Sequence, residues 1–188
     1  MITAREVVVS LYGALRLARF DAGGMAFFDT SRDGFWRSFY AALLVAPLYL
    51  AVLLVRFASG EVEADALRYL VVEASGYTIH WVAFPLIMFT ACRAMEREER
   101  YVPFIVAYNW AAVIQNAVFL PVALFGFLDV FPENFSILVG GILFSAILVY
   151  DWFVARTALQ VSALIAGLIV AFGLFLNLFV NIATETML

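Results

Sequence analysis

Three residues in the second of five apolar segments have the types and spacing to do chemistry inside a membrane. Glu73, Tyr77 and His80 lie at positions i, i+4 and i+7, which share one face of a helix. A carboxylate and an imidazole on one face can relay a proton or hold a cation, because histidine titrates near physiological pH. Intramembrane ionisable groups are costly and usually face the bundle interior or a water-filled cavity. The other interpretation is a Glu–His or Glu–Arg pair that joins helices near the outer surface.

Carboxamide side chains recur on two other apolar segments. Asn109 and Asn116 share a helical face with Gln115 beside it, and Asn177 and Asn181 lie four residues apart. Together with the second segment they could line a polar conduit. Carboxamides in lipid also hydrogen-bond across helices, for about 0.6–2 kcal/mol each. The sequence leaves both interpretations open.

Metal and enzyme chemistry find little support in the sequence. His80 is the only histidine, and Glu73 with His80 cannot complete a four-ligand zinc site. The chain has no His-Glu-x-x-His motif, no phosphate-binding glycine loop followed by lysine and no Gly-x-Ser-x-Gly elbow. Its single cysteine, Cys92, cannot form an intrachain disulfide. We therefore expect a non-enzymatic protein without metal or cofactor.

Five apolar segments must position these side chains. The 188-residue chain is 65% hydrophobic, whereas soluble domains are about 45–50% apolar. About 20 apolar residues cross a bilayer as a helix, so the sequence predicts an all-α, polytopic membrane helix bundle with five transmembrane helices. The net charge is −4 and no basic stripe exists, so we expect no nucleic-acid partner. The predicted spans are 36–56, 66–92, 102–128, 135–153 and 159–183.

The arginines indicate an orientation. Nine precede the first span or lie in the second and fourth connections, whereas Arg56 and Arg68 are assigned to the first connection. Positive residues gather on the cytoplasmic side, so we expect a cytoplasmic N-terminus and an outside C-terminus. No cleavable signal peptide is visible. A bacterial inner (plasma) membrane is the expected location.

Residues 1–35 are predicted to form a cytoplasmic amphipathic segment before a five-span domain at 36–188. Within this segment, 4–20 is expected to be an interfacial helix. Its apolar face is predicted to hold Val7, Leu11, Leu15 and Ala18, and its opposite face Arg5, Tyr12, Arg16 and Arg19. Such a helix can lie among headgroups and attract anionic membrane lipid, or it can dock a cytosolic partner.

Small residues form a stripe at the start of the fourth span. Ser136 and Gly140 lie four residues apart, as do Gly141 and Ser145. This small-xxx-small spacing lets helices approach closely, and we expect packing within the chain.

The connection between the first and second spans, residues 58–65, is acidic through Glu61, Glu63 and Asp65. Asp65 is predicted to cap the second span.

The layout resembles the Yip1-domain family of small five-span membrane proteins over about residues 36–183. Gly76-Tyr77, followed by apolar residues and Pro85, is similar to the Gly-Tyr pair of that family. The Asp-Leu-Tyr-Gly-Pro motif of eukaryotic members is not matched; residues 10–14 contain only its centre. The resemblance implies a non-enzymatic membrane protein that self-associates or binds partners.

Two functions follow as hypotheses. The first is a membrane organiser or accessory subunit that acts through helix–helix contacts as a homo-oligomer or with another membrane protein. The second is a small proton- or ion-coupled transporter or channel that uses the polar face of the second span.

Overall fold

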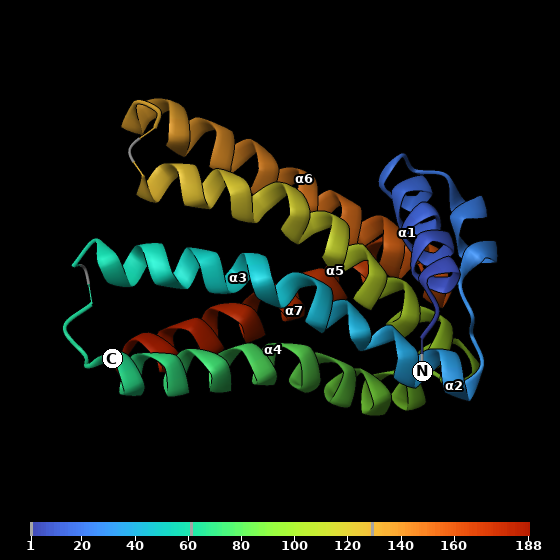
Figure 1. Cartoon of the computed structure of the whole chain (residues 1–188). Coiled ribbons are helices and arrows are strands. Elements are labelled where there is room, and N and C mark those ends of the chain that lie inside the picture. Colours follow the sequence, from blue (N-terminus) through green and yellow to red (C-terminus); the bar gives the residue numbers. More distant parts are fainter. Residues whose placement is uncertain (1, 61, 129) are drawn as a thin grey trace.

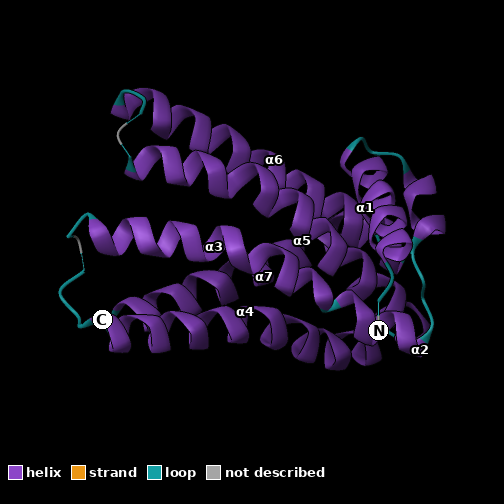
Figure 2. Cartoon of the chain, viewed as in Figure 1, coloured by secondary structure: helices purple, strands orange, loops and turns teal. Residues whose placement is uncertain are grey.

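The computed structural model describes residues 2–60, 62–128 and 130–188, and within them the chain is a bundle of helices joined by short connections (Figure 1; Figure 2). Glu61, part of the predicted acidic connection, lies outside the described residues. The helices in chain order are α1 Ala4–Ala18, the short 3-10 helix η1 Ala22–Phe27, α2 Arg32–Ser38, α3 Tyr40–Ala58, α4 Ala66–Ala94, α5 Glu98–Phe127, α6 Glu133–Leu159 and α7 Ala163–Glu185.

Five long helical segments are apolar enough to cross a membrane: 32–58, 66–94, 98–127, 133–159 and 163–185. The predicted all-α, five-span fold is therefore confirmed. The first of these segments joins α2 to α3 through Phe39, so the boundary drawn at residue 35 falls inside α2.

Side-chain caps and one left-handed residue explain several helix ends. Asp65 caps α4 as predicted, since its carboxylate accepts from the backbone N–H of Leu67 and Arg68 at 3.1 Å. Gln160 has a positive φ of 52° and ends α6, and Ser162 then caps α7. The connection between the fourth and fifth spans was predicted at residues 153–159. This prediction is wrong, because α6 continues to Leu159 and α7 begins at Ala163. Residues 95–97 separate α4 from α5.

The long helices alternate in direction, which gives the bundle two distinct ends. The N-terminus, α2 and the α4–α5 connection lie at one end, and the C-terminus lies at the other with the α3–α4 and α5–α6 connections (Figure 1). We call these the N-terminal end and the C-terminal end. The outer halves of α5 and α6 diverge from α3 toward the C-terminal end (Figure 1).

The helix α1 crosses the N-terminal end of the bundle and packs on α5 and α6. The Tyr150 hydroxyl of α6 donates to the Ala14 carbonyl at 2.7 Å. Its buried face is Ser10, Gly13, Ala14 and Leu17. The predicted apolar face is rotated from this one, and its Leu15 is 43% exposed. The face that contains Gly13 is buried because Gly13 and Gly24 let α1 and η1 pack closely. A Cβ on Gly13 would lie 2.9 Å from the Gly24 carbonyl.

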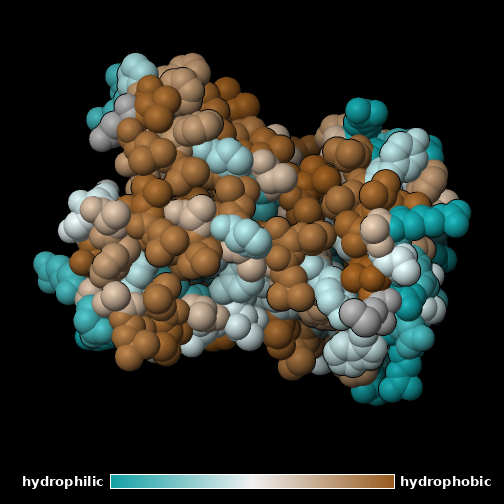
Figure 3. Space-filling model, viewed as in Figure 1, coloured by the Kyte–Doolittle hydropathy of each residue, from teal (hydrophilic) through white to brown (hydrophobic). Residues whose placement is uncertain are grey.

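Most of the tightly packed core lies toward the N-terminal end. Leu17, Ile105 and Leu159 are fully buried there, whereas many large apolar side chains elsewhere are exposed. The visible surface is mostly hydrophobic, with hydrophilic residues gathered at the ends (Figure 3). This distribution suits a bundle whose sides contact lipid and whose ends contact water.

Candidate functional site

Glu73 lies in a cluster contributed by three helices near the C-terminal end. Its carboxylate is 5% exposed and accepts a 2.7 Å hydrogen bond from the Tyr49 hydroxyl of α3. Arg56, in the last turn of α3, lies 3.5 Å from Glu73 and 2.8 Å from Glu185 of α7. We call Tyr49, Arg56, Glu73 and Glu185 the Glu73 cluster. It holds two carboxylates against one guanidinium.

Tyr77 joins this cluster only through Tyr49. The two rings stack with centroids 4.8 Å apart, and the Tyr77 hydroxyl donates to the Ala42 carbonyl at 2.6 Å. The Tyr77 hydroxyl therefore fixes α4 to α3.

His80 pairs with the asparagines of α7 and not with Glu73. Its Nε2 lies 3.1 Å from Asn181 Oδ1, and the Asn181 amide donates to Asn177 Oδ1 at 2.9 Å. With Asn181 Oδ1 as acceptor, Nε2 carries the proton. His80, Asn177 and Asn181 form what we call the carboxamide chain. Both asparagines are exposed on the surface of α7.

Glycines let α4 and α7 come close enough to form this chain. A Cβ on Gly76 would lie 2.8 Å from the Thr184 hydroxyl, and one on Gly173 would lie 3.2 Å from the Phe84 ring. The first of these glycines belongs to the Gly76-Tyr77 pair noted in the sequence. Its role in this structure is to admit α7.

Asn109 and Asn116 do not share a polar path. Asn109 is buried in α5, and its amide donates to the Ser38 hydroxyl at 2.8 Å, where α2 meets α3. Its Oδ1 has no hydrogen-bond partner among the described residues. Asn116 instead donates to the Ala112 carbonyl of its own helix at 2.8 Å.

Asp151 is a membrane-embedded carboxylate that the sequence reasoning missed. It lies inside α6 and accepts a 2.6 Å hydrogen bond from the Gln115 amide of α5. The sequence reasoning ended the span at this charge. The signal that could have found it is the run of apolar and small residues from Phe153 to Leu159, broken only by Arg156 and Thr157. Arg56 supplies the Glu–Arg pair that the sequence offered as one interpretation of Glu73, although its charge had assigned it to a connection.

The small-residue stripe on α6 has no close neighbour in this chain. A Cβ added to Gly140 or Gly141 would meet no described atom within 4 Å, and the Ser145 hydroxyl donates to the Gly141 carbonyl of its own helix. The expected packing inside the chain is therefore not found. Gly140 and Gly141 instead border open space on α6, and we call these two glycines with Ser136 and Ser145 the open strip.

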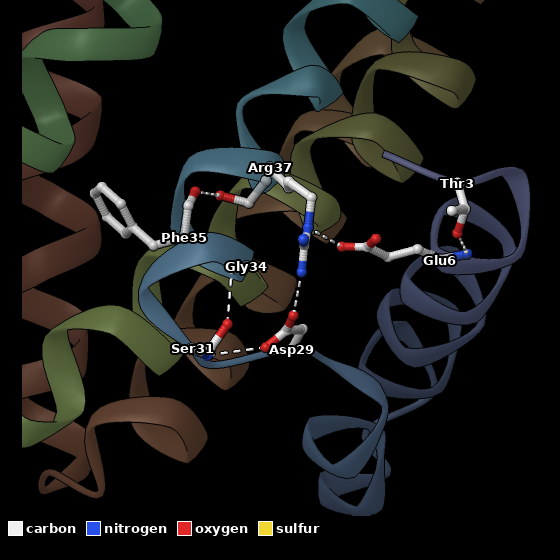
Figure 4. A network of polar contacts seen from close by, with 8 residues as sticks. Thr3, Glu6, Asp29, Ser31, Gly34, Phe35 and Arg37 are labelled. Atoms are coloured by element: carbon white, nitrogen blue, oxygen red, sulfur yellow. Dashed lines mark hydrogen bonds and ion pairs between the residues drawn. The ribbon is translucent and has the colours of Figure 1, made fainter. Parts of the chain in front are cut away.

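Arg37 joins α1 to the start of the first span. It donates to Glu6 of α1 at 2.7 Å and forms an ion pair with Asp29 (Figure 4). Asp29 also accepts from the Ser31 backbone N–H at 2.9 Å. Hydrogen bonding from the side chain and backbone of Ser31, and then the interaction with Arg37, lower the pKa of Asp29 below its ordinary value. We call Glu6, Asp29, Ser31 and Arg37 the Arg37 clamp.

Taken together, the intramembrane polar groups form several separate contacts, most of them between helices, and not one continuous path. Among the described residues, no three His, Cys, Asp or Glu side chains lie close enough to hold a metal ion. The paired groups can fasten helices, and the exposed carboxamides of α7 can bond to a further polar group. No family model matches the chain, and neither a curated protein nor a solved structure matches it significantly.

Proposed function

We propose that this polytopic membrane protein is a non-enzymatic organiser or accessory subunit that binds another membrane protein through its helices. The observation that carries the proposal is the exposure of Asn177 and Asn181 on α7. They bond to His80 and to each other, but these hydrogen bonds leave the amide nitrogen of Asn177 without a partner among the described residues. These two present polar groups sideways, toward whatever surrounds the bundle.

The depth of Asn177 makes its unpartnered amide group costly in lipid alone. Asn177 lies eight residues before the end of α7 at Glu185, which is about 12 Å from the nearer end of the helix. A polar N–H group without a hydrogen-bond partner in hydrocarbon costs on the order of several kcal/mol. A polar group from a neighbouring transmembrane helix would remove that cost.

The open strip on α6 provides a further surface for helix contact. Gly140 and Gly141 have room beside them for another backbone, and small residues allow close helix approach. The resemblance to Yip1-domain proteins agrees with a role in self-association or partner binding. That resemblance rests on the sequence features alone.

The test is to remove the exposed carboxamides and follow the native complex. A tagged chain expressed at native level is extracted mildly and run on a native gel. We expect the wild type to migrate as a discrete complex larger than one chain, and the Asn177→Leu/Asn181→Leu double variant to migrate as a single chain. The matched control is Asn116→Leu, which removes a carboxamide bonded to its own helix and should leave the complex intact.

Migration of the wild type as a lone chain in several mild detergents would contradict the proposal. Cross-linking in the intact membrane, with a photoreactive residue at position 178, provides a measurement that does not depend on extraction. We expect one discrete product, formed either with a second copy or with one other membrane protein.

The Glu73 cluster favours a second candidate, a proton- or ion-coupled transporter. A cleft of about 260 Å³ opens at the C-terminal end, lined by Arg56, Val62, Glu63, Glu185 and Leu188. Arg56 therefore links this cleft to the buried Glu73 carboxylate. This function predicts pH-dependent flux in proteoliposomes that Glu73→Gln abolishes. Wild-type flux equal to that of empty vesicles would exclude it.

A further inference from the structure

An apolar cavity of about 410 Å³ lies between α5 and α6. Ile114 and Val118 of α5 and Leu143 and Ala146 of α6 line its sides, and Phe20, just after α1, lies at its N-terminal end. The volume falls within the range of pockets that hold single small ligands, about 300–1,000 Å³. The cavity extends from Tyr150 to Leu143 along α6, which is about 10 Å of helix.

The lining specifies an apolar occupant. Its polar side chains already have partners: Gln115 donates to Asp151, and the Ser145 hydroxyl donates to its own helix. The Tyr150 hydroxyl likewise donates to the Ala14 carbonyl. No polar group in the cavity therefore requires a polar ligand, and a hydrocarbon chain satisfies the site.

Two arginines lie beyond the N-terminal end of the cavity. Arg19 precedes Phe20, whose ring packs on Phe153 of α6 with centroids 5.3 Å apart. Arg156 lies six residues beyond Tyr150, about 9 Å further along the helix, and its guanidinium sits 5.2 Å from the centre of the Trp152 ring. Both arginines are exposed, and neither forms an ion pair among the described residues.

The carboxylates near these arginines are already engaged. Asp21 forms an ion pair with Arg16, and hydrogen bonding from Arg16 lowers the pKa of Asp21. Asp151 accepts from Gln115 in the α5–α6 contact. Arg19 and Arg156 therefore remain available to an anion beyond the end of the cavity that Phe20 and Tyr150 line.

From this arrangement we infer that the α5–α6 cavity binds one acyl chain of an anionic phospholipid, with the phosphate-bearing headgroup held by Arg19 and Arg156. An acyl chain in the cavity contacts the apolar side chains that line it. The two guanidinium groups donate hydrogen bonds to the headgroup oxygens. This site lies apart from the exposed asparagines of α7 that carry the proposed partner contact, and it shares only Ser145 with the open strip on α6.

The first experiment uses the wild-type chain in vesicles of phosphatidylcholine with a minor fraction of phosphatidylglycerol. Either lipid carries a diazirine in the middle of one acyl chain. We expect the phosphatidylglycerol probe to label residues 114–118 and 143–150 preferentially over the phosphatidylcholine probe. The inference would be overturned if the two lipid probes label the chain equally or if the label spreads along α4 and α7. It would also be overturned if residues that line the cavity cross-link to another protein.

The second experiment separates the acyl chain from the headgroup by native mass spectrometry of the purified protein with each lipid. We expect wild type to bind phosphatidylglycerol at least about tenfold more tightly than phosphatidylcholine, because each arginine near an anionic surface adds on the order of a fivefold gain. Ala146→Phe fills the cavity and should abolish retention of the lipid. Arg19→Gln/Arg156→Gln should remove the preference for phosphatidylglycerol.

Matched controls lie on other surfaces. Ala171→Phe adds the same ring to an exposed position of α7, and Arg68→Gln removes an exposed arginine at the C-terminal end. Both should bind lipid as wild type does. Retention of phosphatidylglycerol by a folded Ala146→Phe protein would overturn the inference, and the wild-type labelling pattern decides the case if that variant does not fold.

Discussion

At the residue scale, the buried carboxylate of Glu73 depends on Arg56 for its charge balance. Arg56→Met leaves that carboxylate with only the Tyr49 hydrogen bond. We expect a loss of about 2–4 kcal/mol in the free energy of unfolding, which includes the low end of the range for breaking a buried ion pair because Arg56 is partly exposed. The measurement is reversible unfolding in mixed micelles.

Neutralising Glu73 should have a much smaller effect. Glu73→Gln retains an acceptor for Tyr49 and no longer needs a counter-ion, so we expect a loss of about 1 kcal/mol. In the Arg56→Met/Glu73→Gln double variant, most of the Arg56→Met loss should be recovered. If the losses in the free energy of unfolding of the two single variants simply add in the double variant, Arg56 and Glu73 do not form an ion pair in the membrane.

At the element scale, the glycine contact between α4 and α7 sets their separation. A side chain on Gly76 meets Thr184, whereas one on Gly167 of α7 meets open space. Gly76→Leu should therefore lower the free energy of unfolding by about 1–3 kcal/mol through overpacking, and it should break the hydrogen bond between His80 and Asn181. Gly167→Leu should change stability by less than about 0.5 kcal/mol. Equal effects would show that α7 lies elsewhere.

The Arg37 clamp makes the docking of α1 sensitive to acid. Because the pKa of Asp29 is lowered in the folded protein, its contribution is fully present above the ordinary value of 3.8 and is lost as pH falls below it. Asp21, whose pKa is also lowered, acts in the same direction at the other end of α1. We expect amide hydrogen exchange in α1, corrected for the intrinsic rate, to accelerate below about pH 4.

Asp29→Asn provides the control for this pH effect. It should speed exchange in α1 at neutral pH and reduce its acid dependence, leaving the part due to Asp21. An acid response in α1 unchanged by Asp29→Asn would mean that other groups hold the helix. Exchange in α5 should stay slow in both proteins, because the ion pairs of Asp21 and Asp29 are with Arg16 and Arg37 and not with α5.

At the scale of the whole molecule, apolar length was enough to predict the five-span bundle, but charge misled the placement of span ends. The fourth span was predicted to end at residue 153, yet α6 continues to Leu159, and Asp151 lies inside it because Gln115 of α5 donates a hydrogen bond to its carboxylate. The partners of His80 and Glu73 depend on which helices become neighbours. Periodicity along one helix carries no information about that, so the shared face of Glu73, Tyr77 and His80 did not predict their separate contacts.

The distribution of arginines between the two ends predicts how the bundle sits in its membrane. Nine arginines lie toward the N-terminal end, in the N-terminal segment, in α2, in the α4–α5 connection and in the adjoining ends of α4, α5 and α6, whereas Arg56 and Arg68 lie toward the C-terminal end. We expect the N-terminal end in the cytoplasm. In a bacterial inner membrane, alkaline phosphatase fused after Leu188 should then be active, and a green fluorescent protein fused there should be dark. The reverse pattern would place Arg19, Arg156 and the Arg37 clamp outside, and a cytoplasmic-leaflet lipid could then no longer reach the α5–α6 cavity.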